Sequence, residues 1–376
     1  MIGKIFIISL MLYPAFAFSQ PEIVWQACFG GSGDDFFTDA AVTSDNGFIA
    51  TLESTSTDGD LTGHTPFPGW VMKFDSDLNV EWQKFYNSDK CGYSFYRVEQ
   101  LPNGNFIFGC GGGGIGCPGN QGSADIALVE TTFDGEIIWS RLYGSPGDDL
   151  FENFTPTEDG GYLITGSSYS SGGNIPFHYG GSLSTDAIVL KIDNEGNLIW
   201  LKVLGGSSYD KPLGNPIERS RGVYHIQIGS SSSDHDFGGT GIDDLKKRMI
   251  IEIDSEGNIL NENFISAEDD ILDFGGEWIL RNDTVLLATT GNSSSSIYPT
   301  VPDHQGTEGA IVYFNNSLEI QSMKQWGGSG DDFIKRVERD NSGNYYLLGT
   351  STSQDYDLPD NYNSGDELDY WLLKTD

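Results

Sequence analysis

Basic side chains are scarce in this sequence. Its 376 residues contain 20 Lys and Arg against 55 Asp and Glu, so the formal net charge is −35. A field of that sign repels nucleic acids and anionic membrane surfaces, and we expect neither as a partner. Cations, basic proteins and neutral glycans remain compatible with it.

Long hydrophobic runs are also missing. The apolar segment at residues 5–12 is too short to span a membrane, and no later segment is long enough. It follows Lys4 and leads to Ala17 and Ser19, a pattern typical of a cleaved signal peptide over residues 1–19. We therefore predict a secreted chain without a membrane span, whose mature part, residues 20–376, is a single domain.

Cysteine is the third scarce residue, with only Cys28, Cys91, Cys110 and Cys117. Their spacing does not match a zinc site. An exported chain can oxidise its cysteines, and four of them allow three pairings. Cys110 and Cys117 flank a glycine-rich segment and are the favoured local pair.

Glycine and aromatic residues are plentiful, with 49 Gly, 22 Phe, 17 Tyr and 8 Trp. They recur in a unit of about 60 residues that is present six times. The unit starts near a Trp, continues with Gly-Gly and an Asp pair, and ends near Lys-hydrophobic-Asp. Its leading positions are Trp25, Trp82, Trp139, Trp200, Leu260 and Ser322. A repeat of this length predicts a propeller or a solenoid.

Each unit contains four short segments rich in β-branched and aromatic residues, which predict strands A to D. In the third unit these are residues 138–143, 150–156, 162–167 and 187–192. Tight Asp/Asn-to-Gly turns join B to C, as at 45–47 and 159–161, and join D to the next A, as at 193–196. A sheet is therefore expected to contain B, C and D of one unit and A of the next.

The two ends of the repeat array are complementary under this pairing. The last unit lacks a following strand A, and the chain start has a spare one at residues 23–28. We predict that this strand pairs with residues 371–374, so that the fold is all-β, a six-bladed β-propeller of four-stranded blades closed by its N-terminal strand. Closure removes exposed sheet edges, whereas an open solenoid would need polar capping units.

Strand alternation places the A–B and C–D loops on one side of the disc, named here the long-loop face. The C–D loops are long and variable, for example at residues 55–69 and 168–185. Binding residues concentrate on long loops held by a rigid scaffold, so this face and the mouth of the central channel are the candidate functional surface.

The repeat resembles those of secreted β-propeller proteins common in Bacteroidetes. The resemblance is carried by residues 25–35, 56–60, 159–162 and 369–374, and it covers nearly the whole mature chain. It implies the fold and an extracellular location but no particular activity. Many proteins of this kind end in a type IX secretion sorting domain; the sequence ends at Asp376 without one, so surface attachment by that route is not expected.

Aspartate pairs in the C–D loops are candidate Ca²⁺ ligands, because carboxylate oxygens are the donors that this ion prefers. They are Asp58, Asp60, Asp234, Asp236, Asp355 and Asp357. None matches the spacing of an EF-hand. The alternative interpretation is that these carboxylates cap turns by accepting hydrogen bonds from backbone N–H groups, without a metal.

Loop aromatics are the candidate ligand-binding residues: Phe67, Phe177, Tyr179, Phe237, Tyr298 and Tyr356. Each could equally pack its own loop. The repeated Trp residues are expected to pack between blades, and His64, His178, His235 and His304 to anchor their loops rather than to bind a metal.

The predicted function is a secreted, non-catalytic binding or scaffold propeller. Its partner would be a glycan or an extracellular protein bound on the acidic long-loop face, with Ca²⁺ as a candidate stabilising ion. The main alternative is a glycan-degrading enzyme with Glu152 and Asp273 at the channel mouth. A purely structural surface protein is a third possibility.

Overall fold

The computed structural model describes residues 27–62, 69–86, 92–113, 117–238, 247–266, 277–281, 284–292, 307–315, 318–339, 344–358 and 369–375. Within these residues the chain is all-β, and its strands form six antiparallel sheets that we number as blades 1 to 6 along the chain. Five blades have four strands and the last has three. The fold is a β-propeller with four-stranded blades.

The strand bounds follow the repeat. Blades 1 to 3 consist of β1 (Asp35–Val42), β2 (Phe48–Ser54), β3 (Trp70–Phe74) and β4 (Val80–Phe85); β5 (Gly92–Gln100), β6 (Phe106–Gly113), β7 (Ala124–Thr131) and β8 (Ile137–Tyr143); β9 (Asp149–Pro156), β10 (Tyr162–Ser168), β11 (Asp186–Ile192) and β12 (Leu198–Leu204). Blades 4 to 6 consist of β13 (Asp210–Ser220), β14 (Val223–Ser230), β15 (Lys247–Asp254) and β16 (Ile259–Ser266); β17 (Glu277–Arg281), β18 (Thr284–Asn292), β19 (Thr307–Phe314) and β20 (Ile320–Trp326); β21 (Asp332–Arg339), β22 (Tyr345–Ser351) and β23 (Asp369–Thr375). Two 3₁₀ turns, η1 (Gly59–Leu61) and η2 (His235–Phe237), lie in C–D loops.

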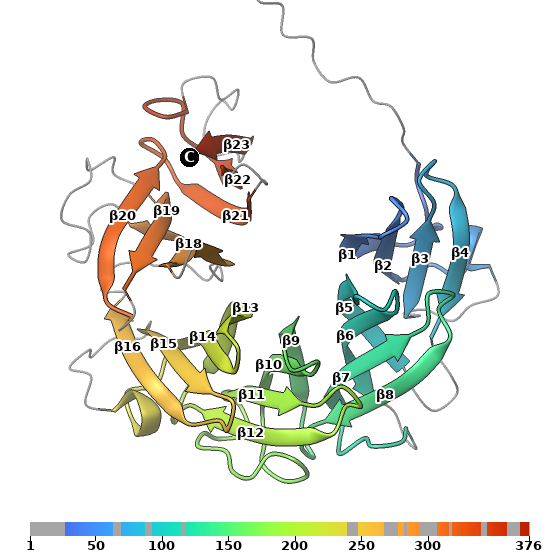
Figure 1. Ribbon diagram of the computed structural model, residues 1–376, viewed down its shortest axis with the longest axis horizontal. Coiled ribbons are helices and arrows are strands. Elements are labelled where there is room, and N and C mark those ends of the chain that lie inside the picture. The colour runs from blue at the N-terminus through green and yellow to red at the C-terminus, as the bar shows by residue number, and fades with distance from the viewer. Residues whose placement is uncertain are drawn as a thin grey trace, which may run out of the picture.

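The blades are arranged around a central axis (Figure 1). The first strand of each blade, such as β5, β9 and β13, lies on the inside, and the fourth strand, such as β8, β12 and β16, lies on the outside. In each complete blade the outer strand comes from the start of the next sequence repeat, as expected. The first and last blades stand apart in this view, so the arc is open between β1 and β23.

The tight turns have the predicted geometry. Asp193 opens the β11–β12 turn, and its Oδ1 accepts hydrogen bonds from the N–H groups of Glu195 (2.9 Å) and Asn197 (2.8 Å). Gly196 closes the turn at φ +80°, a left-handed conformation that glycine adopts without steric cost. Local chemistry of this kind favours a hairpin between strands that are neighbours in sequence.

Buried lysines explain the Lys-hydrophobic-Asp motif. Lys191 in β11 is 1% exposed. Its Nζ donates to Asp159 in the β9–β10 turn (3.0 Å) and to the carbonyl of Ile192 (3.1 Å). Lys73 in β3 makes the equivalent contacts, with Asp45 at 2.8 Å. Burial alone would raise the pKa of Asp45, but Lys73 and the neighbouring turn donors hold it at about 2. Each lysine thus ties two tight turns of its blade together.

The core lies between the blades. Strand β11 is buried along its whole length, as expected for a strand covered on both faces. The repeated Trp residues dock neighbouring blades: Trp200 of β12 lies against Gly257 in the β15–β16 turn, and its Nε1 donates to the carbonyl of Ser255 at 2.8 Å. Trp139 packs edge-on to Tyr162 of the next blade at 6.3 Å. The prediction that these rings pack between blades is confirmed for Trp82, Trp139 and Trp200, and Trp25 lies outside the described residues.

Two sequence predictions need comment. The expected Cys110–Cys117 disulfide is wrong: Cys110 is a free, fully buried thiol and Cys117 is disulfide-bonded elsewhere. The side chain of Cys110 points into the core, with Sγ 3.5 Å from the carbonyl oxygen of Ala127, so it does not face the loop that follows β6. The closing strand expected at 23–28 lies largely outside the described residues; Ala27 and Cys28, which are described, form no strand.

Among the described residues, no helix is long and apolar enough to cross a membrane.

Candidate functional site

The A–B and C–D loops of a blade are joined by a network of carboxylates and backbone N–H groups on the long-loop face. In blade 4, Asp236 Oδ2 accepts from Gly205 N (2.9 Å) and Asp234 Oδ1 accepts from Ser207 N (2.7 Å). Asp210, which occupies the second position of the Asp pair of the loop signature, accepts a hydrogen bond from Gly206 N at 2.7 Å. The three successive N–H groups of the Gly-Gly-Ser segment therefore all donate to carboxylates. The first and third donate to the Asp-x-Asp motif, and the second donates to Asp210.

The same network recurs in blades 1 and 6. Asp60 and Asp58 accept from Gly30 N (2.9 Å) and Ser32 N (2.7 Å), and Asp355 accepts from Ser329 N (2.7 Å). Hydrogen bonds from the Ser32 and Ser207 segments lower the pKa values of Asp58 and Asp234.

All six predicted calcium ligands therefore accept hydrogen bonds from backbone N–H groups: Asp58, Asp60, Asp234, Asp236, Asp355 and Asp357. In the part of the chain that the structure describes, no group of three or more His, Cys, Asp or Glu side chains is placed to hold a metal ion.

The predicted ligand-binding aromatics have different environments. Phe177 and Tyr179 lie 5.0 Å apart, and Tyr179 stacks on His235 at 4.2 Å, so the C–D loops of blades 3 and 4 meet in a small aromatic cluster. Tyr356 is 62% exposed. Phe237 is fully buried and packs edge-on to Phe264, so its ring fills the core instead of facing solvent. Phe67 and Tyr298 lie outside the described residues.

The loop histidines that the structure describes also have different environments. His178 Nδ1 lies 3.0 Å from the carbonyl oxygen of Gly180, which is the expected contact within its own loop. His235 has φ +49° and contributes its ring to the aromatic cluster. His64 and His304 lie outside the described residues.

A pocket of about 520 Å³ opens where blade 2 departs from the repeat. Of the other described first strands, four begin with Asp35, Asp149, Asp210 and Asp332 and β17 begins with Glu277, whereas β5 begins with Gly92. Strand β6 ends in Gly111, Gly112 and Gly113, where β2 and β10 end in Ser54 and Ser168. In blade 2, glycines thus occupy both the strand-starting position of the Asp and the strand-ending position of the Ser. Because these two side chains are missing, space remains at this end of the blade.

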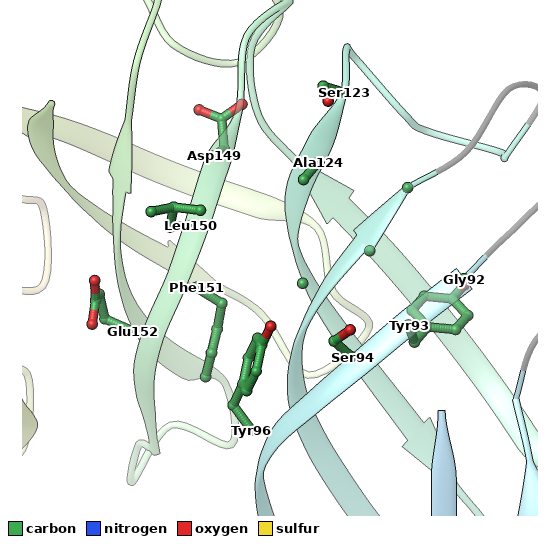
Figure 2. A pocket seen from close by; sticks show the side chains of 13 residues that line it. Gly92, Tyr93, Ser94, Tyr96, Ser123, Ala124, Asp149, Leu150, Phe151 and Glu152 are labelled. Atoms are coloured by element: carbon green, nitrogen blue, oxygen red, sulfur yellow. The ribbon is translucent and has the colours of Figure 1, made fainter. Parts of the chain in front are cut away.

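Figure 2 shows how side chains line this pocket. Tyr96 of β5 and Phe151 of β9 project toward one another from neighbouring inner strands. Tyr96 is 45% exposed, and its ring lies 3.6 Å from the point where a Cβ at Gly111 would sit. The hydroxyl groups of Ser94 and Ser123 and the backbone of the glycine segment supply polar atoms. The wall is therefore aromatic and hydroxylic, without a basic group.

Two carboxyl groups border the pocket, and they differ. Asp149 is fully buried and accepts hydrogen bonds from Ser145 N (2.6 Å) and Ser145 Oγ (3.0 Å). Glu152 lies on the opposite side of β9 from Phe151 in Figure 2. Desolvation raises its pKa, against the opposing effects of Lys211 and Ser167. Asp273, the other carboxylate of the predicted enzyme site, lies outside the described residues.

Sequence reasoning identified the loop aspartates that form the network but missed this pocket. The signal was present, because the second repeat loses its Gly–Asp signature and carries the run 109–114 with five glycines. The fifth repeat also loses the signature, at residues 265–270, so this loss alone does not single out the pocket; the glycine run does.

No protein-family model matches the chain, and no curated protein matches it significantly. Solved structures with a similar arrangement include a Bacteroides caccae protein of unknown function, at 13% identity and TM-score 0.43, covering 81% of this chain and 89% of that one. An apocarotenoid oxygenase from Synechocystis matches at 12% identity and TM-score 0.44, over 82% of this chain and 64% of that one. The WD40 domain of Pan2 from Neurospora crassa matches at 10% identity and TM-score 0.41, over 83% and 74%.

Proposed function

We propose that the chain is a secreted, non-catalytic binding propeller, and that its long-loop face binds a neutral glycan with one sugar residue in the pocket between blades 2 and 3. The pocket beside Tyr96 and Phe151 is the observation that carries this proposal. Its volume of about 520 Å³ lies within the range of roughly 300–1,000 Å³ that is typical of small-molecule sites. The signal-peptide pattern at residues 1–19 supports secretion.

The chemistry of the pocket favours a neutral, hydroxylated ligand. An exposed aromatic ring next to a second ring offers an apolar surface to the C–H face of a sugar, and serine hydroxyls and strand-end backbone groups can bond its hydroxyls. The net charge of −35 disfavours an anionic ligand. A basic side chain that could neutralise such a ligand is missing from the residues that line the pocket.

Binding without hydrolysis is favoured over the glycan-degrading alternative. Glycoside hydrolysis in most families needs two carboxyl groups that flank the scissile bond, about 5–10 Å apart. Asp149 is buried and bonded to Ser145, and Glu152 lies on the far side of its strand from the aromatic rings. A hydrolysis assay on the glycan that the protein binds would separate the two functions.

Truncation of the exposed ring tests the binding proposal. We expect Tyr96→Ala to weaken binding of the glycan selected on an array by about 10-fold or more, since the lost stacking is worth roughly 1.5 kcal/mol. Isothermal titration calorimetry measures the affinity. The control is Ile199→Ala, which removes an apolar side chain that is 54% exposed on the outer strand β12, outside the pocket, and should leave the affinity unchanged.

Filling the pocket provides the complementary test. A Cβ at Gly92 would meet no atom within 4 Å, so Gly92→Leu should fold normally and obstruct the ligand. Unchanged affinity in both Gly92→Leu and Tyr96→Ala would place the glycan elsewhere on the protein and refute this site.

The second part of the proposal is that the N-terminal strand completes blade 6. In β11 and β7, Lys191 pairs with Trp200 and Glu130 pairs with Trp139. The same register on β23 sets Lys374 opposite Trp25 and Leu372 opposite Ala27. The exposed side chains of blade 6 support it: Tyr370 is 93% exposed, whereas Ala187, at the same position of β11, is fully buried.

Packing of Phe29 on blade 1 supports the same arrangement. Tyr143 follows Trp139 by four residues and packs in the core of blade 3 with Tyr162. Phe29 has the same spacing from Trp25, and its ring lies 5.4 Å from that of Phe74 in blade 1. The end of the N-terminal segment therefore already contacts the next blade as an outer strand would.

Calcium binding by the loop aspartates remains a prediction with a direct test. The ion would need the second oxygen of each carboxylate, because the first accepts a backbone N–H, as in Asp58 and Asp234. A calcium-stabilised protein must melt at a higher temperature in Ca²⁺ than in EDTA. Equal melting temperatures would leave these side chains with the capping role alone.

A further inference from the structure

Buried acidic side chains face one another where consecutive blades meet. One member is the first or second residue of the third strand of a blade, and the other is the first residue of the first strand of the next blade. Each is at most 1% exposed; the pairs are Asp125 with Asp149, Asp186 with Asp210, and Glu308 with Asp332. The arrangement is repeated at the junctions of blades 2 and 3, 3 and 4, and 5 and 6.

In two of the three pairs a glycine lies against both members, and in the third Gly205 lies against Asp186. A Cβ on Gly144 would overlap Oδ1 of Asp125 and lie 2.6 Å from Oδ2 of Asp149, so the two carboxyl oxygens flank one point. Gly327 has the same relation to Glu308 and Asp332, with the Asp332 oxygen at 2.5 Å. The glycines of the Gly-Gly signature are thus needed for space as well as for turn geometry.

In Asp125 and Asp186, the two third-strand aspartates, one carboxyl oxygen accepts a hydrogen bond and the other accepts none among the described residues. Asp125 Oδ2 accepts from Gln121 N (2.7 Å), and Asp186 Oδ2 accepts from Tyr179 N (2.7 Å). Oδ1 of both residues is buried and has no hydrogen-bond partner among the described residues.

Two adjacent carboxylates that are excluded from water cannot both keep their charge without a large electrostatic penalty. A single proton relieves it, since a protonated oxygen can donate a hydrogen bond to the facing carboxylate, which would also give the buried Oδ1 of Asp125 or Asp186 a partner. We propose that each of these three junctions binds one proton between its two carboxyl groups, and that acidification therefore stabilises the contact between blades.

The acidities support this assignment. Desolvation, reinforced by the neighbouring carboxylate, raises the pKa values of Asp125 and Asp210 to about 6 and that of Glu308 to about 8. A carboxyl group with a raised pKa in the folded state binds its proton more tightly when folded. Its stabilising effect is complete below about pH 4 and is lost as the pH rises through 6 to 8.

The charged groups around each pair differ. Asp149 is the charged group that acts on Asp125. Glu308 faces carboxylates only, from Asp332, Asp355 and Asp357. The middle pair has a mixed environment, because Asp186 is acted on by His178 and His235 as well as by Asp236. Both histidines act to lower the pKa of Asp186, so the outer two pairs should dominate the pH dependence.

Thermal unfolding at pH 5 and pH 8 tests the proposal. We expect the melting temperature of the unmodified protein to fall by about 5–10 °C between these values. In the variant Asp125→Asn, Asp186→Asn, Glu308→Gln, each amide can donate to the facing carboxylate without a titrating proton, so this fall should shrink to less than half. The control variant, Asp77→Asn, Asp134→Asn, Glu195→Gln, removes three exposed carboxylates and should keep the full pH dependence.

A second readout does not depend on how the variants fold. Infrared spectra of the unmodified protein should retain the carbonyl band of neutral carboxylic acids at pH 6, where ordinary carboxyl groups are ionised. Absence of that band, or a melting temperature that does not fall from pH 5 to pH 8, would overturn the proposal. So would a rise in melting temperature with Ca²⁺ at pH 8 that the triple amide variant abolishes, because a metal ion would then occupy the pairs.

Discussion

Deletion of residues 20–28 should lower the melting temperature by about 10 °C or more and make the protein prone to aggregate. Without this segment β23 would remain an unpaired edge, and Tyr370 and Leu372, which are 93% and 67% exposed, would stay uncovered. Each such side chain contributes roughly 1.5–3 kcal/mol when it is buried. Differential scanning calorimetry and light scattering measure the two effects.

The control for this deletion keeps the chain length. Replacement of residues 20–28 by nine Gly and Ser residues should destabilise the protein as much as the deletion does, because the lost side chains and strand propensity matter rather than the length. A peptide with the sequence of residues 20–30 should restore part of the stability in trans. A deletion variant that melts like the full mature chain would contradict the closure of the ring.

Substitution of Gly144 by Ala should cost about 3 kcal/mol or more of the free energy of unfolding. The added Cβ would overlap Oδ1 of Asp125 and lie 2.6 Å from Oδ2 of Asp149. Both side chains are fully buried and hydrogen-bonded to backbone, so neither can move aside without breaking those bonds. Chemical denaturation of the purified variant measures the change.

Gly181→Ala is the matched control for this substitution. Gly181 lies in an exposed loop of blade 3, has no positive φ, and has no atom within 4 Å of the position of an added Cβ. Its variant should change the free energy of unfolding by less than about 0.5 kcal/mol. Equal and small effects at both positions would mean that the carboxyl pair is not packed against Gly144 as described.

Closure of the ring would extend the carboxyl pairs by one. Asp369 begins β23 as Asp186 begins β11, and Asp35 begins β1 as Asp210 begins β13. In the closed ring these two residues would face each other at the junction of blades 6 and 1. The acid stabilisation proposed for the described junctions would then apply at the seam as well.

Local chemistry explains why so much of the fold was predictable. The expected strands at 150–156, 162–167 and 187–192 match β9, β10 and β11 to within one residue, because turn residues such as Asp193 and Gly196 fix the hairpins between neighbours in sequence. Because the unit repeats, a strand or turn predicted in one unit is also predicted at the same position of the others. The open arc remains because closure depends on a contact between the two ends of the chain.

Side-chain direction is where sequence reasoning failed. Proximity in sequence suggested a disulfide between Cys110 and Cys117, but Cys110 occupies an inward position of β6 and its thiol is buried. Strand alternation decides this outcome, and a shift of one residue would reverse it. Phe237 is a similar case: it lies in a long loop and yet fills the core beside Phe264.

The candidate site was harder to predict because two kinds of chemistry share the same residues. A carboxylate at a loop such as Asp58 can bind a cation or accept a backbone N–H, and the sequence alone does not show that Ser32 N lies 2.7 Å from it. The pocket was missed for a different reason. It exists because side chains are absent at Gly92 and Gly111, and a search for chemically active residues does not register an absence.

Disulfide trapping tests ring closure most directly. The register of the other blades sets Ala27 opposite Leu372, so Ala27→Cys with Leu372→Cys, in a Cys28→Ser background, places two thiols on adjacent strands. The account predicts that this variant forms the bond nearly completely in air, detected by intact mass and by a cyclic form that survives cleavage at one inter-blade loop. Failure to form it in folded, soluble protein would show that the N-terminal strand does not lie against β23.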